Sequence, residues 1–412
     1  MASGNPFTPS FGVSPPLLVG REGAVEAFAE ALEEGLGSPY RATLITGQRG
    51  SGKTVLLNAL EDEARRRGWV VASETTRPGV AAELAGSTLP ALLRQFPGAY
   101  DSFLNGGGAS VAGVGLNVSR QRVDNFPVQP SLRHTLTTLA DAADQAGGGV
   151  LITLDEVGRD GLADLQIIAQ VVQHTFREGR QVVFAAAGLP SHIQGLLQSP
   201  GTTFLRRAER VHLGPVSLTD VARAISEPMA AAGRTIDGEA LSVATEGTRG
   251  YPFMIQMIGF QLWRASEGGQ AVTPDQARSA IEAAGRRVGQ LVHEPALAEL
   301  SSVDRTFLAA MAVDDQPSKM SDIRDRMGVD GNYASQYRLR LIQAELIHAP
   351  SYGRVDFLLP HLREYLREHA SHDVLTPPTS GSDRLAASQA RHPGGHPGGH
   401  PGPAGSSPVW TP

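Results

Sequence analysis

Residues 47–54 read Gly-Gln-Arg-Gly-Ser-Gly-Lys-Thr, and this stretch contains Lys53, one of only two lysines in the 412-residue chain. It fits the pattern G-x-x-x-x-G-K-[ST], in which glycines let the backbone curl so that successive N–H groups face phosphate oxygens. The apolar run 42–46 predicts a buried strand before the loop, and residues 55–64 continue at helical periodicity after it. Strand, glycine loop and helix in this order predict a binding site for a nucleoside triphosphate.

Each position of this loop has an expected partner in a bound nucleotide. The Lys53 ammonium group would reach the β- and γ-phosphates, and the Thr54 hydroxyl would face a Mg²⁺ ion. The helix N-terminus would add its partial positive charge. We therefore expect the nucleotide to contact Gly47, Gln48, Arg49, Gly50, Ser51, Gly52, Lys53, Thr54 and Val55. A glycine turn without a ligand is the alternative, and the flanking strand and helix disfavour it.

Two carboxylates follow a second apolar stretch. Residues 149–154 predict a strand, and Asp155 and Glu156 come directly after it. In open parallel sheets ligands bind beyond the carboxyl ends of the strands, so both acids are expected beside the phosphate loop. Asp155 is expected to hold Mg²⁺, which favours one or two carboxylates together with phosphate oxygens. Glu156 would point elsewhere and polarise an attacking water.

The composition excludes several kinds of protein. There is no cysteine, so neither disulfides nor thiolate-bound metals are expected, which suits a cytoplasmic location. The net charge of −6 argues against a chain-wide role on nucleic acid or membrane surfaces. The N-terminal residues lack the basic start and apolar core of a signal peptide, and no apolar run is long enough to span a bilayer. We expect a cytoplasmic protein without membrane contact.

Short apolar runs alternate with helical stretches over residues 17–215, which predicts an α/β fold with a parallel sheet. The expected strands are 41–46, 69–74, 150–154, 181–187 and 210–213. Residues 216–292 have helical patterns throughout, with an N-cap signature at Ser217 and a helix that begins at Pro274. Residues 295–370 form a third unit.

Three stretches carry little pattern. Residues 1–16 are rich in Pro, Ser and Gly and predict a flexible arm. The glycine-rich residues 100–125 predict an inserted loop or hairpin to which no chemistry is assigned. Residues 371–412 cannot bury enough apolar surface to fold. That tail contains His392, His396 and His400, which could bind a metal weakly, although an inert tail is the simpler interpretation.

Residues 17–292 resemble an AAA+ ATPase, of the type shared by origin-recognition proteins, archaeal-type ATPases and STAND signalling ATPases. The resemblance rests on the glycine-rich loop (Walker A), the Asp155-Glu156 strand end (Walker B) and residues 17–22, Leu-Leu-Val-Gly-Arg-Glu. In that family this last box lies against the adenine, which implies that Val19, Gly20 and Arg21 contact the base. The start of an amphipathic helix is the alternative for this stretch.

The resemblance extends to the lid and to hydrolysis. Residues 248–253 resemble the Gly-x-Pro element of STAND lids, which implies that Pro252 lies near the base and Arg249 near the γ-phosphate; a helix-capping loop is the alternative. Arg206 and Arg207 stand where the family has an arginine finger that acts on a neighbouring subunit's nucleotide, which implies self-assembly. A solvated arginine pair explains them equally well. The strand 181–187 ends without the Asn, Thr or Ser with which the family orients water, which puts rapid hydrolysis in doubt.

Residues 295–370 resemble a winged helix-turn-helix domain, with helices expected at 303–311, 321–327 and 332–342 and a hairpin at 346–359. If the domain reads DNA, the resemblance places these side chains on the duplex: Ser335, Gln336, Arg338, Arg340 and Arg354. Residues 301–370 hold nine Lys and Arg against ten Asp and Glu, so they lack the basic surplus that gives DNA binding most of its affinity. Docking to a protein partner is the alternative.

Two functions are open at this level. The chain is either an ATPase that hydrolyses ATP with Mg²⁺ and so moves its lid and its C-terminal unit on DNA, or a STAND-like signalling or scaffold protein. In the second case ATP/ADP exchange matters and turnover is slow. The departure at 181–187 and the near-neutral C-terminal unit favour the second function. A small-molecule kinase is disfavoured by the helical lid and the appended third unit.

Overall fold

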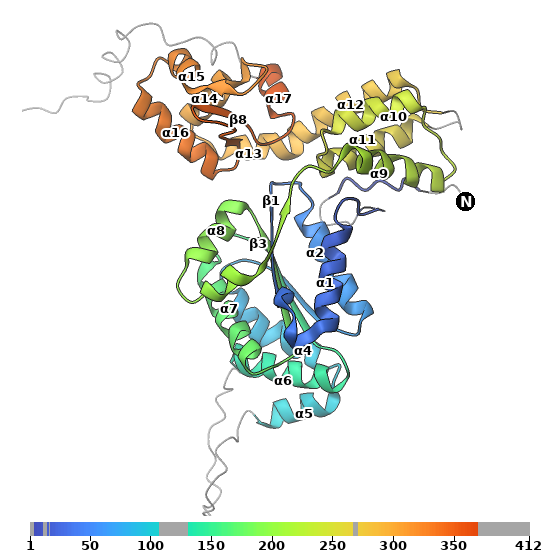
Figure 1. Cartoon of the computed structure of the whole chain (residues 1–412), viewed down its shortest axis with the longest axis vertical. Helices are drawn as coiled ribbons and strands as arrows, with labels where there is room; N and C mark the ends of the chain where they lie inside the picture. The colour runs from blue at the N-terminus through green and yellow to red at the C-terminus, as the bar shows by residue number, and fades with distance from the viewer. Residues whose placement is uncertain (1–3, 11–14, 16, 107–130, 267–270, 370–412) are drawn as a thin grey trace, which may run out of the picture.

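In a computed structural model of the chain, which describes residues 4–10, 15, 17–106, 131–266 and 271–369, five parallel strands form a central sheet (Figure 1). The strand order is β2-β3-β4-β1-β5. The strands are β1 (Ala42–Gly47), β2 (Val70–Thr75), β3 (Val150–Val157), β4 (Val182–Gly188) and β5 (Glu209–Leu213). This sheet confirms the predicted α/β fold, and each predicted strand is present.

Helices cover both faces of the sheet, because alternate side chains of the inner strands are apolar on both sides. On β1, Ile45 packs in the core with α1 and α2, whereas Leu44 packs in the opposite core with α6, α7 and α8. Both side chains are fully buried. The covering helices are α1 (Glu22–Glu34), α2 (Lys53–Arg66), α6 (Leu132–Gln145), α7 (Leu162–Arg177) and α8 (Pro190–Gln198).

The connection from β2 to β3 is helical. It contains α3 (Val80–Glu83), the π-helical turn Leu84–Thr88, α4 (Leu89–Leu93), α5 (Pro97–Gly106) and α6. The loop or hairpin predicted at 100–125 therefore begins as a helix, and residues 107–130 lie outside the described residues. The tail 371–412 with His392, His396 and His400 also lies outside them.

A second, helical unit follows β5. Its helices are α9 (Leu218–Ala231), α10 (Gly238–Thr248), α11 (Pro252–Ala265) and α12 (Pro274–Val288). The predicted caps are confirmed: Ser217 Oγ accepts from the Asp220 N–H at 3.1 Å, and Thr273 and Gln276 form a capping box ahead of Pro274. The unit has its own apolar core, which includes Ile225, Met254, Ile258 and Val288.

The C-terminal unit combines short helices with a three-stranded antiparallel sheet of order β6-β8-β7. Its elements are α13 (Glu294–Ala298), α14 (Ser302–Ala312), β6 (Ser318–Lys319), α15 (Met320–Met327), α16 (Gly331–Gln343), β7 (Ile347–His348), β8 (Arg354–Phe357) and α17 (Leu362–His369). The three predicted helices and the hairpin are present, and β6 and α17 are additional. Phe307, Ile323, Leu341 and Val355 meet in its core.

The N-terminal arm is not loose where the structure describes it, which corrects the prediction of a flexible arm. Phe7 is 1% exposed and lies in the core of the helical unit, against Gly259 of α11. The Asn5 side chain donates to the Phe260 carbonyl at 3.3 Å, and the Thr8 N–H donates to Gln256 Oε1 at 3.1 Å. The composition of the arm is that of a loop, but one aromatic ring is enough to anchor it.

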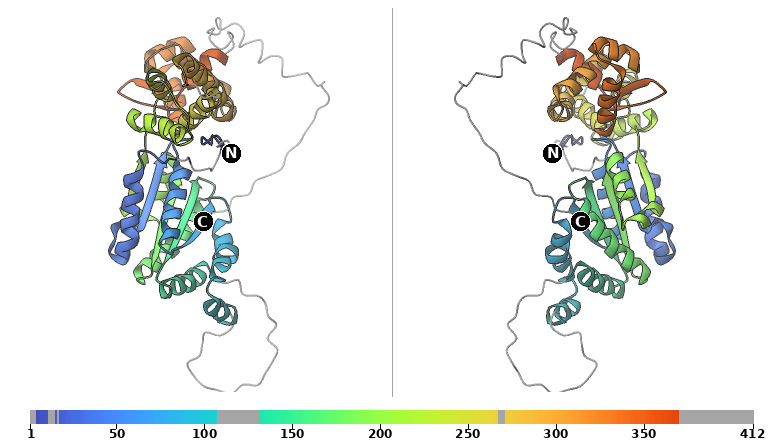
Figure 2. Two further views of the ribbon diagram at one scale, coloured as in Figure 1. Left: turned by 90° about the vertical axis from the view of Figure 1, so that its right-hand side faces the viewer. Right: turned by 90° about the vertical axis from the view of Figure 1, so that its left-hand side faces the viewer.

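Both upper units lie at the carboxyl end of the sheet. In Figure 1 the helical unit (yellow-green) and the C-terminal unit (orange) are side by side above the strand ends, and Figure 2 shows the same arrangement from two further sides. Among the described residues, no helix is long and apolar enough to cross a membrane. The fold therefore brings three units around the edge of the sheet where the glycine-rich loop begins.

Candidate functional site

The glycine-rich loop joins β1 to α2 at this edge. Gly50 and Gly52 have φ of 72° and 91°, a region that favours glycine, and these two residues let the chain turn into the helix. The Lys53 Nζ donates to the carbonyl oxygens of Gly47 at 2.9 Å and Gln48 at 2.7 Å. Ser51 Oγ is buried with no hydrogen-bond partner within the described part of the chain. A buried hydroxyl without a partner suits a ligand that brings its own oxygens.

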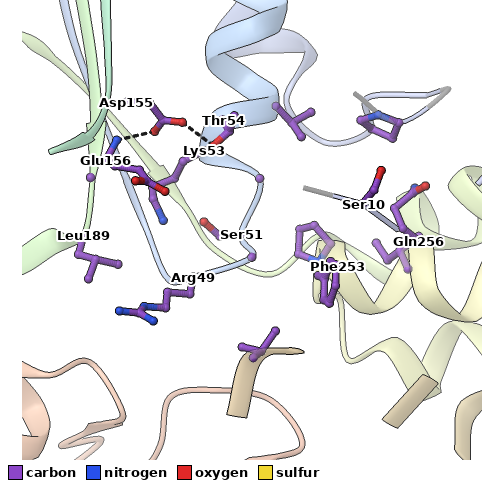
Figure 3. Close-up of a pocket in the computed structure, with 18 of the residues that line it drawn as sticks. Ser10, Arg49, Ser51, Lys53, Thr54, Asp155, Glu156, Leu189, Phe253 and Gln256 are labelled. Carbon is purple, nitrogen blue, oxygen red and sulfur yellow. Dashed lines mark hydrogen bonds between the residues drawn. The ribbon is translucent and has the colours of Figure 1, made fainter. Parts of the chain in front are cut away.

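A cavity of about 580 Å³ opens beside this loop, between the sheet and the helical unit (Figure 3). From the loop and α2 it is lined by Arg49, Gly50, Ser51, Gly52, Lys53, Thr54 and Val55. Gly47 and Gln48, also predicted as contacts, are not among the lining residues. Their carbonyl oxygens accept hydrogen bonds from the Lys53 Nζ. A cavity of this size is typical of small-molecule sites.

The two carboxylates at the end of β3 face the cavity. Thr54 Oγ1 donates to Asp155 Oδ2 at 2.5 Å, and the Glu156 N–H donates to Asp155 Oδ1 at 2.8 Å. Glu156 is exposed and has a φ of 53°, where the register between β3 and β4 shifts. This left-handed backbone turns the Glu156 side chain out of the regular strand pattern. The Thr54 hydroxyl and the Asp155 carboxylate are thus bonded to each other, and Glu156 joins them through its backbone N–H rather than its carboxylate.

Burial lowers the pKa of Lys53, and the charges of Asp155 and Glu345 oppose that shift. Glu345 belongs to the C-terminal unit, in the turn after α16. The Lys53 ammonium group is therefore within electrostatic reach of two carboxylates of β3, Asp155 and Glu156, and of one from the C-terminal unit. The sequence predicted the two from β3 but not Glu345.

The residues around Thr54 fit a Mg²⁺ ion for which phosphate oxygens and water supply most of the coordination shell. No group of three or more His, Cys, Asp and Glu side chains that could hold a metal is found in the described residues. One hydroxyl and one carboxylate are what Mg²⁺ requires from a protein when phosphate oxygens and water complete its shell. Thr54 and Asp155 supply that pair.

The far end of the cavity is apolar and fits a base. It is lined by Leu18, Val19, Val216, Pro252, Phe253, Ile255, Leu291, Val292 and Pro295. Val19 and Pro252, which the family resemblance assigns to the base, are among these lining residues. Gly20 and Arg21 are outside the lining, and Arg21 instead donates to the Gly214 carbonyl at 2.5 Å. Burial lowers the pKa of the Arg21 guanidinium.

The N-terminal arm supplies part of the same wall. Thr8, Ser10 and Pro15 line the cavity, and in Figure 3 Ser10 lies beside Gln256 of α11. The position of this wall depends on the Phe7 ring, which fills the space left by Gly259. The composition of residues 1–16 gave no sign of this role, and the presence of phenylalanine in a segment otherwise rich in Pro, Ser and Gly was the available signal.

We expect Phe7→Ala to detach this segment, because removing a buried phenyl ring costs about 3 kcal/mol and, among the described residues, two hydrogen bonds to α11 would remain to hold it. Hydrogen exchange of residues 4–10 should become fast, and nucleotide dissociation should accelerate. Phe7→Leu, which keeps most of the apolar contact, should have a smaller effect on both. If Phe7→Ala leaves the exchange of this segment unchanged, the anchor lies elsewhere.

Tyr251 is a second residue that sequence reasoning missed. Its hydroxyl donates to the Arg49 carbonyl at 2.9 Å, and a side chain at Gly50 would overlap with its ring. Tyr251 is 4% exposed, and burial raises its pKa. The glycine-rich loop is therefore bonded directly to the start of α11, so a change in the loop reaches the helical unit. The neighbouring Gly-Tyr-Pro sequence was the available signal.

Three predicted arginines do not reach the cavity. Arg249, with φ 51°, forms an ion pair with Glu364 of α17 at 2.6 Å instead of facing the phosphates. Arg206 and Arg207 are exposed on the 3-10 turn before β5, and the Arg206 Nε donates to the Leu197 carbonyl. The prediction that Arg249 lies near the γ-phosphate is wrong for this arrangement, because the C-terminal unit offers it a nearer carboxylate.

The predicted DNA contacts divide into two groups. Ser335 and Gln336 are exposed on α16, and Arg338 is half-buried. Arg340 pairs with Asp304 at 2.9 Å, and Arg354 donates to the Pro317 carbonyl at 2.9 Å. Asp304 is only 1% exposed, so Arg340 neutralises a buried charge within the unit. Those two arginines are engaged inside the unit rather than free for a duplex.

Comparisons with known proteins agree with this geometry. Residues 17–184 match the AAA ATPase domain family, and residues 290–366 match a domain of unknown function, DUF8462. The comparison with curated proteins returned no match.

Solved structures share the fold at low sequence identity. The Walker-type ATPase paby2304 of Pyrococcus abyssi is 17% identical with a TM-score of 0.58, over 85% of this chain and 96% of that one. The ORC2 protein of Aeropyrum pernix, solved as ADPNP-ADP complexes, is 18% identical with a TM-score of 0.60, over 93% of this chain and 98% of that one. The family match over residues 17–184, the parallel sheet and the glycine-rich loop together support an AAA+ P-loop ATPase domain in this part of the chain.

Proposed function

We propose that the chain binds ATP with Mg²⁺ in the cavity between the sheet and helices α9–α12, and that hydrolysis changes how the helical and C-terminal units are held. The observation that carries this proposal is the bond from Tyr251 to the Arg49 carbonyl. It joins the loop expected to hold the phosphates to the helix that lines the base end of the cavity. A nucleotide in the cavity would contact both units at once.

Each residue has a distinct task in this proposal. Lys53 leaves the carbonyls of Gly47 and Gln48 for phosphate oxygens, which are charged and therefore stronger acceptors. Thr54 and Asp155 hold the ion, which supplies charge neutralisation on the phosphates when bound. The exposed Glu156 carboxylate would orient a water and accept its proton as the water attacks the terminal phosphorus, while the bond from that phosphorus to the β–γ bridging oxygen breaks and ADP leaves.

We also propose a division of the chain by task. Residues 17–215 form the ATPase core, 216–292 the lid and 295–370 a winged-helix domain, while 371–412 form a tail without a task in nucleotide binding. The helix order α14, α15, α16 and the strands β7 and β8 support the winged-helix assignment. In an assembly of several copies, the exposed Arg206 or Arg207 would act on the neighbour's nucleotide.

Steady-state release of phosphate from ATP, measured with and without duplex DNA, tests the proposal. The expected result is Mg²⁺-dependent release above the level of a Lys53→Ala control. If the wild type releases phosphate no faster than Lys53→Ala while ADP stays tightly bound, the chain is not an ATP-hydrolysing enzyme. That result would support the second function, described next.

A STAND-like nucleotide switch with little turnover is the second candidate. One observation favours it: β4 ends at Gly188 without a polar side chain, and the first hydroxyl after it, that of Ser191, donates to Glu345 of the C-terminal unit. In this function exchange of ADP for ATP frees the C-terminal unit to dock a protein partner.

DNA binding by α16 is tested with Arg338 and not with Arg340. Arg340→Ala would leave the buried Asp304 carboxylate unpaired and so destabilise the unit itself. We expect Arg338→Ala to weaken duplex binding about fivefold and to reduce the salt slope by about one if the helix contacts phosphates. Arg278→Ala, an exposed arginine on α12, is the matched control and should change neither. The absence of salt-dependent binding in the wild type would exclude the DNA role.

A further inference from the structure

The C-terminal unit places a carboxylate against the end of β4. Glu345 Oε1 accepts from both the backbone N–H and the hydroxyl of Ser191, each at 3.0 Å. Glu345 is 8% exposed, and its Oε2 is buried with no hydrogen-bond partner in the described chain. Its φ of 56° belongs to the C-cap of α16, in which the Glu345 N–H donates to the Ile342 carbonyl at 3.0 Å and the Leu346 N–H to the Leu341 carbonyl at 3.1 Å.

This carboxylate stands at the side of the nucleotide cavity. A second cavity of about 390 Å³ is lined by Glu345, and three residues, Arg49, Leu189 and His192, line both cavities. In Figure 3 the orange ribbon of the C-terminal unit passes below Arg49, on the opposite side of the loop from Thr54. The negative charge of Glu345 raises the pKa of Lys53, in opposition to the effect of burial. Lys53 is the residue expected to bind the β- and γ-phosphates.

With ATP bound, the γ-phosphate and the Glu345 carboxylate would both be attracted to the Lys53 ammonium group. The γ-phosphate of ATP would add negative charge at Lys53, close to a carboxylate that has little water around it. Like charges in such surroundings repel strongly, because screening by solvent is weak. ADP keeps the β-phosphate but lacks the γ-phosphate, so it would bring less negative charge to Lys53 and repel the carboxylate less.

We propose that Glu345 makes the cavity distinguish nucleoside diphosphates from triphosphates: with the C-terminal unit docked the site favours ADP, and bound ATP releases Glu345 from Ser191. The proposal rests on the nucleotide binding proposed above and adds the residue that reads the terminal phosphate. By linkage, a nucleotide that weakens the Glu345–Ser191 contact is itself bound less tightly while that contact holds.

Glu345→Gln tests the charge and keeps the shape, since the amide oxygen can still accept from Ser191. Binding of ADP and of a non-hydrolysable ATP analogue with Mg²⁺ is measured by calorimetry. The variant should bind the analogue about tenfold more tightly, with a smaller change in its ADP affinity. Glu299→Gln is the matched control. Glu299 is exposed and lines the second cavity, but it is not one of the charged residues that shift the pKa of Lys53.

A ratio of ADP to ATP-analogue affinity that stays at the wild-type value in Glu345→Gln overturns the inference. If the wild type binds neither nucleotide, the proposed function itself has failed, so the two failures are distinct. Ser191→Ala is the second variant. It removes one of the two donors to Glu345 and should shift the ratio in the same direction by about threefold, even if Glu345→Gln does not fold.

Hydrogen exchange gives a readout that does not depend on affinity. The Ser191 amide is bonded to Glu345, so it should exchange faster with the ATP analogue bound than with ADP bound. Equal protection of this amide in both states would show that Glu345 stays in place and would overturn the release.

Discussion

Lys53→Ala is expected to raise the Kd for ATP by a factor on the order of 100, which corresponds to about 3 kcal/mol. In the chain without nucleotide, the ammonium group is satisfied by two loop carbonyls, at 2.9 and 2.7 Å. Bound phosphates would replace these neutral acceptors with charged ones. Alanine has no ammonium group and so cannot bind the phosphates in place of Lys53. Calorimetric titration with ATP and Mg²⁺ measures the loss.

The second lysine of the chain provides the control. Lys319 is exposed on β6, outside the cavity, so Lys319→Ala should bind ATP as the wild type does. Near-equal affinities of Lys53→Ala and Lys319→Ala, with both proteins folded by circular dichroism, would contradict the phosphate site at the glycine-rich loop.

Glu156→Gln should slow phosphate release about 100-fold or more and leave ATP binding nearly intact. The carboxylate is exposed at the cavity, while its backbone N–H bonds to Asp155 and so fixes the residue beside the ion-holding pair. Glutamine preserves shape and contacts but cannot accept a proton from water. Single-turnover release and ATP binding, measured on the same preparation, separate the two effects.

Asp160→Asn is the matched control for this substitution, because it neutralises an exposed carboxylate four residues away that does not line the cavity. Its turnover should equal that of the wild type. Release from Glu156→Gln at the wild-type rate would remove Glu156 from the proposed chemistry, and another group or water alone would then have to act as the base.

The strands were predictable because their signals are local. The predicted strand 41–46 is Ala42–Gly47 in the structure, and 181–187 is Val182–Gly188. Val182–Gly188 has no polar side chain, and Ala42–Gly47 has only two threonines among its apolar residues, as is typical of strands buried on two faces. The same holds for the glycine-rich loop, whose backbone requires glycine at φ of 72° and 91° and so leaves its pattern in the sequence.

Contacts between units were not predictable in this way. Arg249 was placed near the phosphates, whereas in the structure it pairs with Glu364, 115 residues further along the chain. The anchor of Phe7 against α11 and the bond from Glu345 to Ser191 likewise join distant segments. A single chain gives no signal for such pairs, since any exposed arginine or isolated phenylalanine looks the same in sequence.

The sequence by itself determined that a β1–loop–α2 unit would form and that Lys53, Thr54 and Asp155 would meet at the end of a parallel sheet. These features could be predicted because the period of a strand, the conformation of a glycine and the start of a helix depend on neighbouring residues in the chain. Only the tertiary structure decided what surrounds that centre: the Phe7-anchored wall, Tyr251 on the loop, and Glu345 bonded to Ser191 after β4. These depend on how three separately packed cores dock, which is set by surface complementarity between residues far apart in the chain.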